Sequence, residues 1–263
     1  MSSTVRPAAV SGTFYPGSAA ELGTTVDALL ASVSVEIRGV PKALIVPHAG
    51  FRYSGPIAAS GFALIAKAAD RLERVVIVGP AHRVYIEGLT WPGATHLQTP
   101  LGEIEVDVEA IRAIPELVAH PEAHAREHSL EVELPFIQRL APRAKVIPIA
   151  ASHAAPQLVG KVLDHLWGGP ETLIVISSDL SHFHPYEEAH AIDRRTAAKI
   201  IALDTGLEGE EACGCTGING LAWVARRRNL RIAVLDLRSS GDTAGSRDEV
   251  VGYGAFAGYE ATA

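Results

Sequence analysis

The sequence predicts an α/β fold in which a central, mostly parallel sheet lies between layers of helices. Three runs of Val, Ile and Leu carry this prediction, because they lack the polar alternation of strands with one solvated face. The runs occupy residues 42–46, 74–78 and 172–176. Segments with a helical spacing of apolar residues separate them, which is the pattern of β-α-β units.

We expect residues 1–263 to form a single domain. A chain of 263 residues with 48% hydrophobic residues can bury one large core. No Pro/Ser-rich linker, low-complexity tract or repeat divides it.

Capping and proline signals place the other elements. Ser18 followed by Glu21 is a capping box that predicts the start of the first helix. Pro56 is expected to open the second helix, Pro135 to kink or restart a short one, and Pro185 to begin a long one. The predicted helices are 18 to before 39, 56–65, 107–118, 130–140, 157–167, 185–203 and 217–228. The predicted strands are 42–47, 74–80, 145–150, 172–178, 231–237 and 250–256, with short β pieces between 85 and 107 and a polar, histidine-rich connection at 120–129.

Charge and composition argue against several classes of protein. The formal net charge of -7 disfavours a nucleic-acid surface, because neutralising phosphates requires clustered Lys and Arg. No stretch approaches 18 apolar residues and the N-terminus lacks an apolar signal core, so we expect no membrane span and a cytoplasmic location. Motifs of serine hydrolases, P-loops, dinucleotide folds and H-E-x-x-H zinc enzymes are absent from the sequence.

The three apolar runs end in side chains that bind metals or move protons. His48 follows the first, His82 the second, and Asp179 and His182 the third. The loops beyond the carboxyl ends of strands are where α/β folds collect their ligands, so one site is expected there. We interpret His48 and His82 as joint metal ligands; the alternative is that their ring nitrogens bond to loop carbonyls.

Other candidates have weaker local signals. Asp179 and His182, three residues apart, could form a carboxylate–imidazole pair for acid–base catalysis, unless Asp179 caps the following turn. Cys213 precedes a predicted helix, whose dipole would lower the thiol pKa and favour a metal-binding thiolate; the alternative is a small buried hydrophobe. One residue between Cys213 and Cys215 is too short a spacing for an unstrained disulfide. Among the histidines of the 120–129 connection, the charged surroundings predict His124 on the surface and leave His128 as the candidate.

Several motifs, in order over nearly the whole chain, resemble the Memo-like family, also called AmmeMemoRadiSam system protein B. They are RPAAVSGTFYPG at 6–17, PHAGFRYSG at 47–55, GPAH at 79–82, EHSLEVELPF at 127–136, SSDLSH at 177–182, CG at 213–214 and SGDTAGSRDEVVGYGA at 240–255. The family is similar in fold to class III extradiol ring-cleaving dioxygenases, which use non-haem Fe(II). The resemblance therefore implies both the fold and the place of the site.

The resemblance also implies roles for individual residues. His48, His82 and Cys213 would be the metal ligands, and Asp179 and His182 would line the pocket, with His182 as acid or base. Cys213 would replace the carboxylate of the dioxygenase triad, which makes Cu or Zn alternatives to Fe(II). Further candidates for the pocket lining are Tyr53, His128 and Cys215.

Three functions remain open from the sequence. The first is metal-dependent redox or dioxygenase-like chemistry on an unidentified small molecule. The second is a zinc-dependent hydrolase that uses metal-activated water. The third is a non-catalytic metal-binding protein or a partner protein in a radical SAM-linked system, which rests on association with the family name alone.

Overall fold

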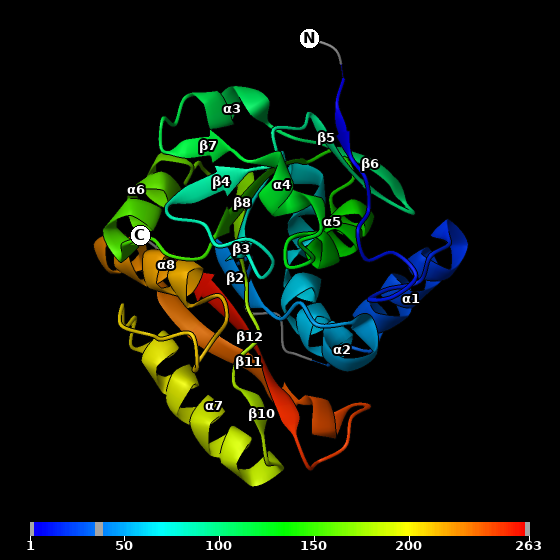
Figure 1. The fold of residues 1–263 in the computed structure, drawn as a ribbon, viewed down its shortest axis with the longest axis vertical. Coiled ribbons are helices and arrows are strands. Elements are labelled where there is room, and N and C mark those ends of the chain that lie inside the picture. Colours follow the sequence, from blue (N-terminus) through cyan, green and yellow to red (C-terminus); the bar gives the residue numbers. More distant parts are fainter. Residues whose placement is uncertain (1–2, 35–38, 261–263) are drawn as a thin grey trace.

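The computed structural model describes residues 3–34 and 39–260 and has the predicted α/β architecture (Figure 1). Counted over these residues, the larger sheet has nine strands, and its centre is a group of parallel neighbours. In spatial order these are β2 (Ala43–Val46), β9 (Thr172–Ser177), β3 (Arg74–Pro80) and β8 (Lys145–Ala151). Every residue of β2 and β9 is buried, as expected for strands covered on both faces.

Further strands extend this sheet on both sides. On one side β12 (Val250–Tyr259) pairs with β2, and β10 (His182–His184) and β11 (Arg231–Ser239) pair with β12. On the other side β4 (Leu89–Trp91) joins β8 to β7 (Leu117–Ala119). A separate small sheet consists of β1 (Val5–Arg6), β5 (His96–Thr99) and β6 (Gly102–Glu105).

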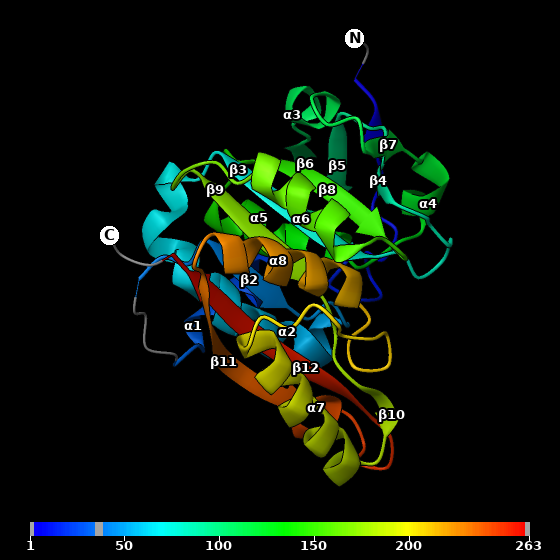
Figure 2. The ribbon, with the colours of Figure 1, turned by 90° about the vertical axis from the view of Figure 1, so that its left-hand side faces the viewer.

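Helices cover both faces of the larger sheet (Figures 1 and 2). One face carries α6 (Pro156–His165), α7 (Tyr186–Ile201) and α8 (Cys215–Arg227). The other carries α1 (Ala19–Ala31), α2 (Phe51–Phe62) and α5 (Leu134–Leu140). The shorter elements are α3 (Val108–Arg112), α4 (Pro121–Ala125), and the 3-10 turns η1 (Ala63–Arg71), η2 (Glu131–Glu133) and η3 (Ser240–Asp242). Within the described ranges, no helix has both the length and the apolar character to cross a membrane.

Three of the predicted helix starts are confirmed. The Ser18 hydroxyl accepts the backbone N–H of Glu21 at 3.3 Å, and α1 begins at the next residue after Ser18. Pro135 lies in the first turn of α5, where its missing N–H is not needed. Pro185 is the N-cap of α7, which has an acidic first turn, as the helix dipole favours.

The prediction that Pro56 opens α2 is wrong, because the helix begins at Phe51 and Pro56 lies inside it. The first turn closes earlier, since the backbone N–H groups of Tyr53 and Ser54 both donate to the carbonyl of Gly50. The proline removes one interior hydrogen bond. Most of the residues of α2 are nevertheless buried, so packing stabilises the helix despite this loss.

Two predictions between residues 107 and 129 are also wrong. The helix α3 ends at Arg112, and the chain continues as strand β7, because Pro115 disfavours helical backbone before it. The histidine-rich connection contains the short helix α4, and His124 is 3% exposed. The ring of His124 hydrogen-bonds the Thr90 hydroxyl at 3.2 Å, and burial lowers its pKa to about 4.

Candidate metal centre

The three strand ends converge because β2, β9 and β3 are consecutive parallel neighbours in the sheet. His48, Asp179 and His82 each lie two residues beyond the end of their strand, at the carboxyl edge. Cys213 comes from the loop between α7 and α8. The sequence therefore predicted correctly that His48, Asp179 and His82 lie at one edge of the sheet. Cys213 reaches the same edge from a loop that is distant in the sequence.

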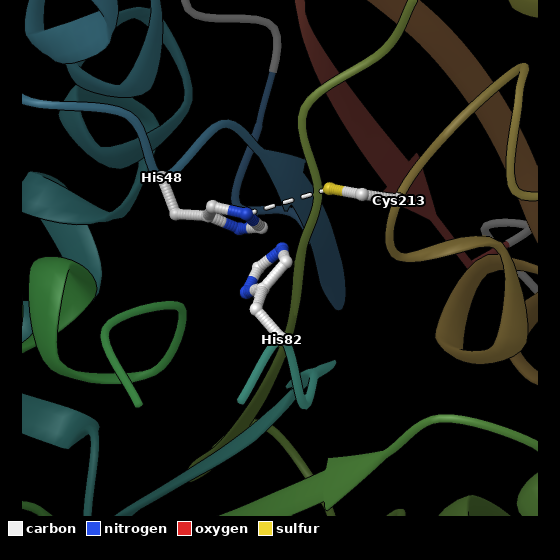
Figure 3. Close-up of side chains that lie close together, drawn as sticks. All are labelled: His48, His82 and Cys213. Atoms are coloured by element: carbon white, nitrogen blue, oxygen red, sulfur yellow. Dashed lines mark hydrogen bonds between the residues drawn. The ribbon is translucent and has the colours of Figure 1, made fainter. Parts of the chain in front are cut away.

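His48, His82 and Cys213 bring their donor atoms within 4.8 Å of one another (Figure 3). The Cys213 Sγ lies 3.4 Å from His48 Nε2, and the two imidazole rings are 5.2 Å apart at 73°. Figure 3 shows one nitrogen of each ring turned toward the other two residues. His48 is only 1% exposed, whereas the side chain of His82 is 30% exposed, so the group opens to solvent on the His82 side.

Glu127 orients the ring of His82. Its Oε1 lies 2.9 Å from His82 Nδ1, and its carboxylate also accepts the backbone N–H groups of His82, His128 and Ser129. Burial alone would raise the pKa of Glu127, but these hydrogen bonds outweigh burial and bring the pKa far below its usual value. An ionised carboxylate only accepts hydrogen bonds, so Nδ1–H of His82 is the donor and Nε2 is the nitrogen turned toward the group.

Ser177, the last residue of β9, holds the ring of His48. Its Oγ lies 2.8 Å from His48 Nδ1, which leaves Nε2 directed at Cys213. Burial first, and the neighbouring His82 and His128 next, lower the pKa of His48 well below its ordinary value, so the ring is neutral. A neutral imidazole with one nitrogen hydrogen-bonded and the other free is the form that binds metals.

Cys213 reaches the group because Gly214 follows it. A Cβ on Gly214 would lie 2.6 Å from the Ser177 carbonyl oxygen and from Ser178 Cβ, so a larger residue would push this loop away from β9. The prediction of a lowered thiol pKa is wrong. Burial, and then the charge of Asp179, raise the pKa of Cys213 strongly. These effects outweigh the lowering of the pKa that was expected from the dipole of α8.

Asp179 and His182 do not form the predicted carboxylate–imidazole pair. Asp179 Oδ1 accepts the backbone N–H of His48 at 2.8 Å, and so ties the loop after β2 to the end of β9. Burial raises the pKa of Asp179 to about 7, even though hydrogen bonds from the backbone of His48 and Ala49 act in the opposite direction. His182 Nδ1 lies 2.8 Å from the Leu180 carbonyl and donates to it, so in the neutral ring the lone pair is on Nε2.

The three further candidates lie in different environments. The ring of His128 stacks on His82 at 4.6 Å and 18°, and burial lowers its pKa to about 4. Cys215 is the first residue of α8, a free thiol packed against the core, with a pKa raised by burial. Tyr53 lies in α2 with 37% of its surface exposed, and its ring lies 5.8 Å from the Arg52 guanidinium. Of the three, His128 makes ring contacts with the candidate ligands.

A second group, formed by His82, Glu127 and His128, also has donor atoms within 4.8 Å. Both oxygens of Glu127 are already held by backbone N–H groups, at 2.5 to 2.9 Å. Binding a metal there would compete with those bonds and with the bond that orients His82. The geometry therefore favours the group that contains Cys213.

Sequence reasoning missed Glu127 and Ser177, the side chains that hold the two candidate histidine ligands. A usable signal lies in EHSLEVEL, where acidic residues alternate with apolar ones in a segment whose apolar residues must be buried. Glu127, Glu131 and Glu133 are indeed all buried. Buried carboxylates require hydrogen-bond donors or cations as partners, so this pattern points to an organised polar site.

Comparison with known proteins identifies a family over most of the chain. The family model described as Memo-like protein matches residues 6–257. A MEMO1 family protein of Aquifex aeolicus is 35% identical over 95% of this chain and 97% of its own length. MEMO1 family proteins of Archaeoglobus fulgidus and Metallosphaera sedula are 32% and 30% identical, over 93% and 94% of this chain and 95% and 97% of their own lengths.

Proposed function

The chain belongs to the Memo-like protein family, and from that premise we propose that it binds one transition-metal ion through His48, His82 and Cys213. The observation that carries the proposal is the arrangement of the two imidazoles. Each has its Nδ1 engaged by a buried side chain, and each directs its other nitrogen toward the thiol. Such outer hydrogen bonds are typical of metal-binding histidines.

We propose Fe(II) as the ion, with Cu or Zn as the alternatives. Two nitrogen donors and one sulfur donor suit all three metals, and Fe(II) follows from the likeness of the family to non-haem iron dioxygenases. Three protein ligands would leave positions open for small molecules, and iron there would supply redox chemistry for a small organic substrate.

The remaining residues would orient the site and move protons. Asp179 holds the backbone of His48, and so fixes the loop that carries this ligand. His182 has the lone pair on Nε2, and its pKa is lowered by burial and by the nearby His82, so the ring is neutral and can accept a proton from a substrate. His128 would form an aromatic wall against His82.

The experiment is metal analysis of protein purified without oxygen or added metal. We expect one ion per wild-type chain, and loss of that ion in each of His48→Ala, His82→Ala and Cys213→Ala. The matched controls are Cys215→Ser, two residues from Cys213, and His165→Ala on the surface. Full metal content in Cys213→Ala would remove the thiol from the site and overturn the proposal.

The metal found also separates the candidate functions. Iron, with oxygen uptake that depends on an added organic substrate and is lost in His182→Ala, would support redox catalysis. Full occupancy by zinc, with no oxygen uptake after iron is added, would favour hydrolysis by metal-activated water. Metal binding without turnover of any substrate would favour a protein that carries a metal or binds a partner protein.

A further inference from the structure

Glu133 is a fully buried carboxyl group beside the candidate metal centre. It lies at the end of η2, is 0% exposed, and has one oxygen, Oε1, 2.8 Å from Ser177 Oγ. In the described part of the chain, its other oxygen, Oε2, has no hydrogen-bond partner. An ionised carboxylate in such a place would be poorly stabilised, because none of the described residues pairs a cation with it.

A proton count at Ser177 defines the state of this group. The Ser177 hydroxyl has one proton and three neighbours: the Ser129 carbonyl oxygen at 2.6 Å, Glu133 Oε1 at 2.8 Å and His48 Nδ1 at 2.8 Å. A carbonyl oxygen only accepts, so the Ser177 proton must point to Ser129. Both lone pairs of the hydroxyl are then left to accept, one from His48 Nδ1–H and one from a protonated Glu133.

The competing assignment is less consistent with these contacts. If Glu133 were ionised and took the hydroxyl proton, two oxygens 2.6 Å apart, Ser177 Oγ and the Ser129 carbonyl, would face each other without a hydrogen. The surroundings agree with the neutral form, since burial, and then the charge of Asp179, raise the pKa of Glu133 well above its usual value.

We propose that Glu133 is kept as a neutral carboxylic acid and acts, through Ser177, as the positioning residue that fixes His48 in its Nδ1–H form. The acid proton occupies one lone pair of Ser177, and His48 can then satisfy the other only as a donor. Nε2 of His48 is thereby left without a proton and faces Cys213. The protonation state is independent of any metal, whereas the role as a positioning residue rests on the proposed function.

Infrared spectroscopy at neutral pH tests the protonation state. Asp179, whose pKa is raised to about 7, also contributes a C=O stretch of a buried protonated carboxylic acid at this pH, so the Glu133 band is the part lost in Glu133→Gln and kept in Asp179→Asn. We expect that part to be present in the wild type, with no change in Glu122→Gln, a surface control. ¹⁵N NMR of the metal-free protein should show the Nδ1–H tautomer of His48 in the wild type and in Glu133→Gln. Absence of the band in the wild type, or a band of unchanged intensity in Glu133→Gln, would overturn the proposal.

Cobalt(II) titration tests the positioning role. Glu133→Gln keeps an N–H donor toward Ser177 and should bind cobalt as the wild type does, whereas Glu133→Leu has no donor and should lose about tenfold in affinity. Equal loss in both variants would mean that an ionised carboxylate is required, and would overturn the proposal, as would wild-type affinity in Glu133→Leu. If the wild type itself bound no metal, the proposed function would fail, while the infrared and NMR results would still decide the state of Glu133.

Discussion

The two candidate histidine ligands are held by opposite kinds of partner. His82, with a partly exposed side chain, is oriented by Glu127, a carboxylate that backbone N–H groups hold in its ionised form. His48, which is buried, is oriented by the uncharged hydroxyl of Ser177, with Glu133 behind it. Both carboxyl groups come from one short segment, yet their environments push their pKa values in opposite directions.

The difference shows how a buried site can limit its charge. A divalent ion bound by a Cys213 thiolate would retain one positive charge, which Glu127 and the ionised fraction of Asp179 balance. A second ionised carboxylate behind His48 would leave an excess negative charge in a region that water does not reach. A hydroxyl and a neutral acid orient the buried ligand without adding charge.

Removing the charge of Glu127, behind His82, should have the largest effect on metal affinity. In Glu127→Gln one carboxylate oxygen becomes an NH₂ group that must face an N–H donor, and the hydrogen bond to His82 loses its charge-assisted strength. We expect metal affinity to fall by about 100-fold and stability by about 1–3 kcal/mol. Metal titration and urea unfolding measure these changes.

Glu122→Gln on the surface of α4 is the control for this comparison and should change neither quantity. If Glu127→Gln bound metal as tightly as the wild type, the charge would have no role in orienting His82. The contrast between the two histidines would then be one of burial alone.

Removing the hydroxyl behind His48 should have a smaller effect on affinity. Ser177→Ala leaves the ring of His48 in place by packing but removes its neutral hydrogen bond. We expect a loss of about tenfold in metal affinity, together with a second His48 tautomer in ¹⁵N NMR spectra. Ser246→Ala, at an exposed serine, is the control. An affinity loss in Ser177→Ala larger than that in Glu127→Gln would reverse the proposed order.

The sequence predicted the sheet and two of the candidate ligands from local information. Apolar runs of β-branched residues specify buried strands, and parallel strands place their carboxyl ends together, so His48 and His82 could be assigned to one edge. Cys213 had only a weaker local signal, its place before a predicted helix, and the resemblance to a family singled it out as the third candidate ligand. Its approach depends on the fit of Gly214 against Ser177 and Ser178 at the end of β9. These residues are far apart in the sequence, so no periodic pattern predicts the contact.

Asp179 and His182 show why sequence spacing alone misassigned a contact. They are three residues apart, but the chain between them turns away: the backbone N–H of Leu180 donates to Gly252, and His182 begins β10 against β12. Asp179 stays at the end of β9 and meets the backbone of His48 instead. A long-range strand pairing therefore decided which partner each side chain found.

A third substitution, Gly214→Ala, tests the position of the Cys213 thiol independently of both histidines. Gly214→Ala would place a Cβ 2.6 Å from the Ser177 carbonyl, so the loop that carries Cys213 must shift while Glu127 stays unchanged. We expect a destabilisation of about 1–3 kcal/mol and a weaker sulfur-to-cobalt absorption band in the cobalt-loaded protein. Gly209→Ala, where a Cβ would have no neighbour within 4 Å, is the control. An unchanged absorption band in Gly214→Ala would show that Cys213 does not depend on this contact.

The most direct measure of the contrast between the two carboxyl groups is the pH dependence of stability. Glu133 has a folded-state pKa well above 4.5, so above pH 4.5 the folded chain keeps a proton that the unfolded chain has lost. Its contribution to stability therefore declines as pH rises, by up to about 1.4 kcal/mol per pH unit. Asp179, with a pKa raised to about 7, acts in the same direction between pH 3.8 and 7.

Glu127 acts in the opposite sense, because its folded-state pKa is lowered; its contribution is complete above pH 4.5 and is lost as pH falls below that value. Urea unfolding of the metal-free protein between pH 4.5 and 8 should thus show Glu133→Gln gaining stability relative to the wild type as pH rises. Over the same range the difference between Glu127→Gln and the wild type should stay constant. Parallel curves of stability against pH for Glu133→Gln and the wild type would mean that Glu133 ionises normally in the folded chain. An ionised carboxylate would then lie behind each of the two histidines.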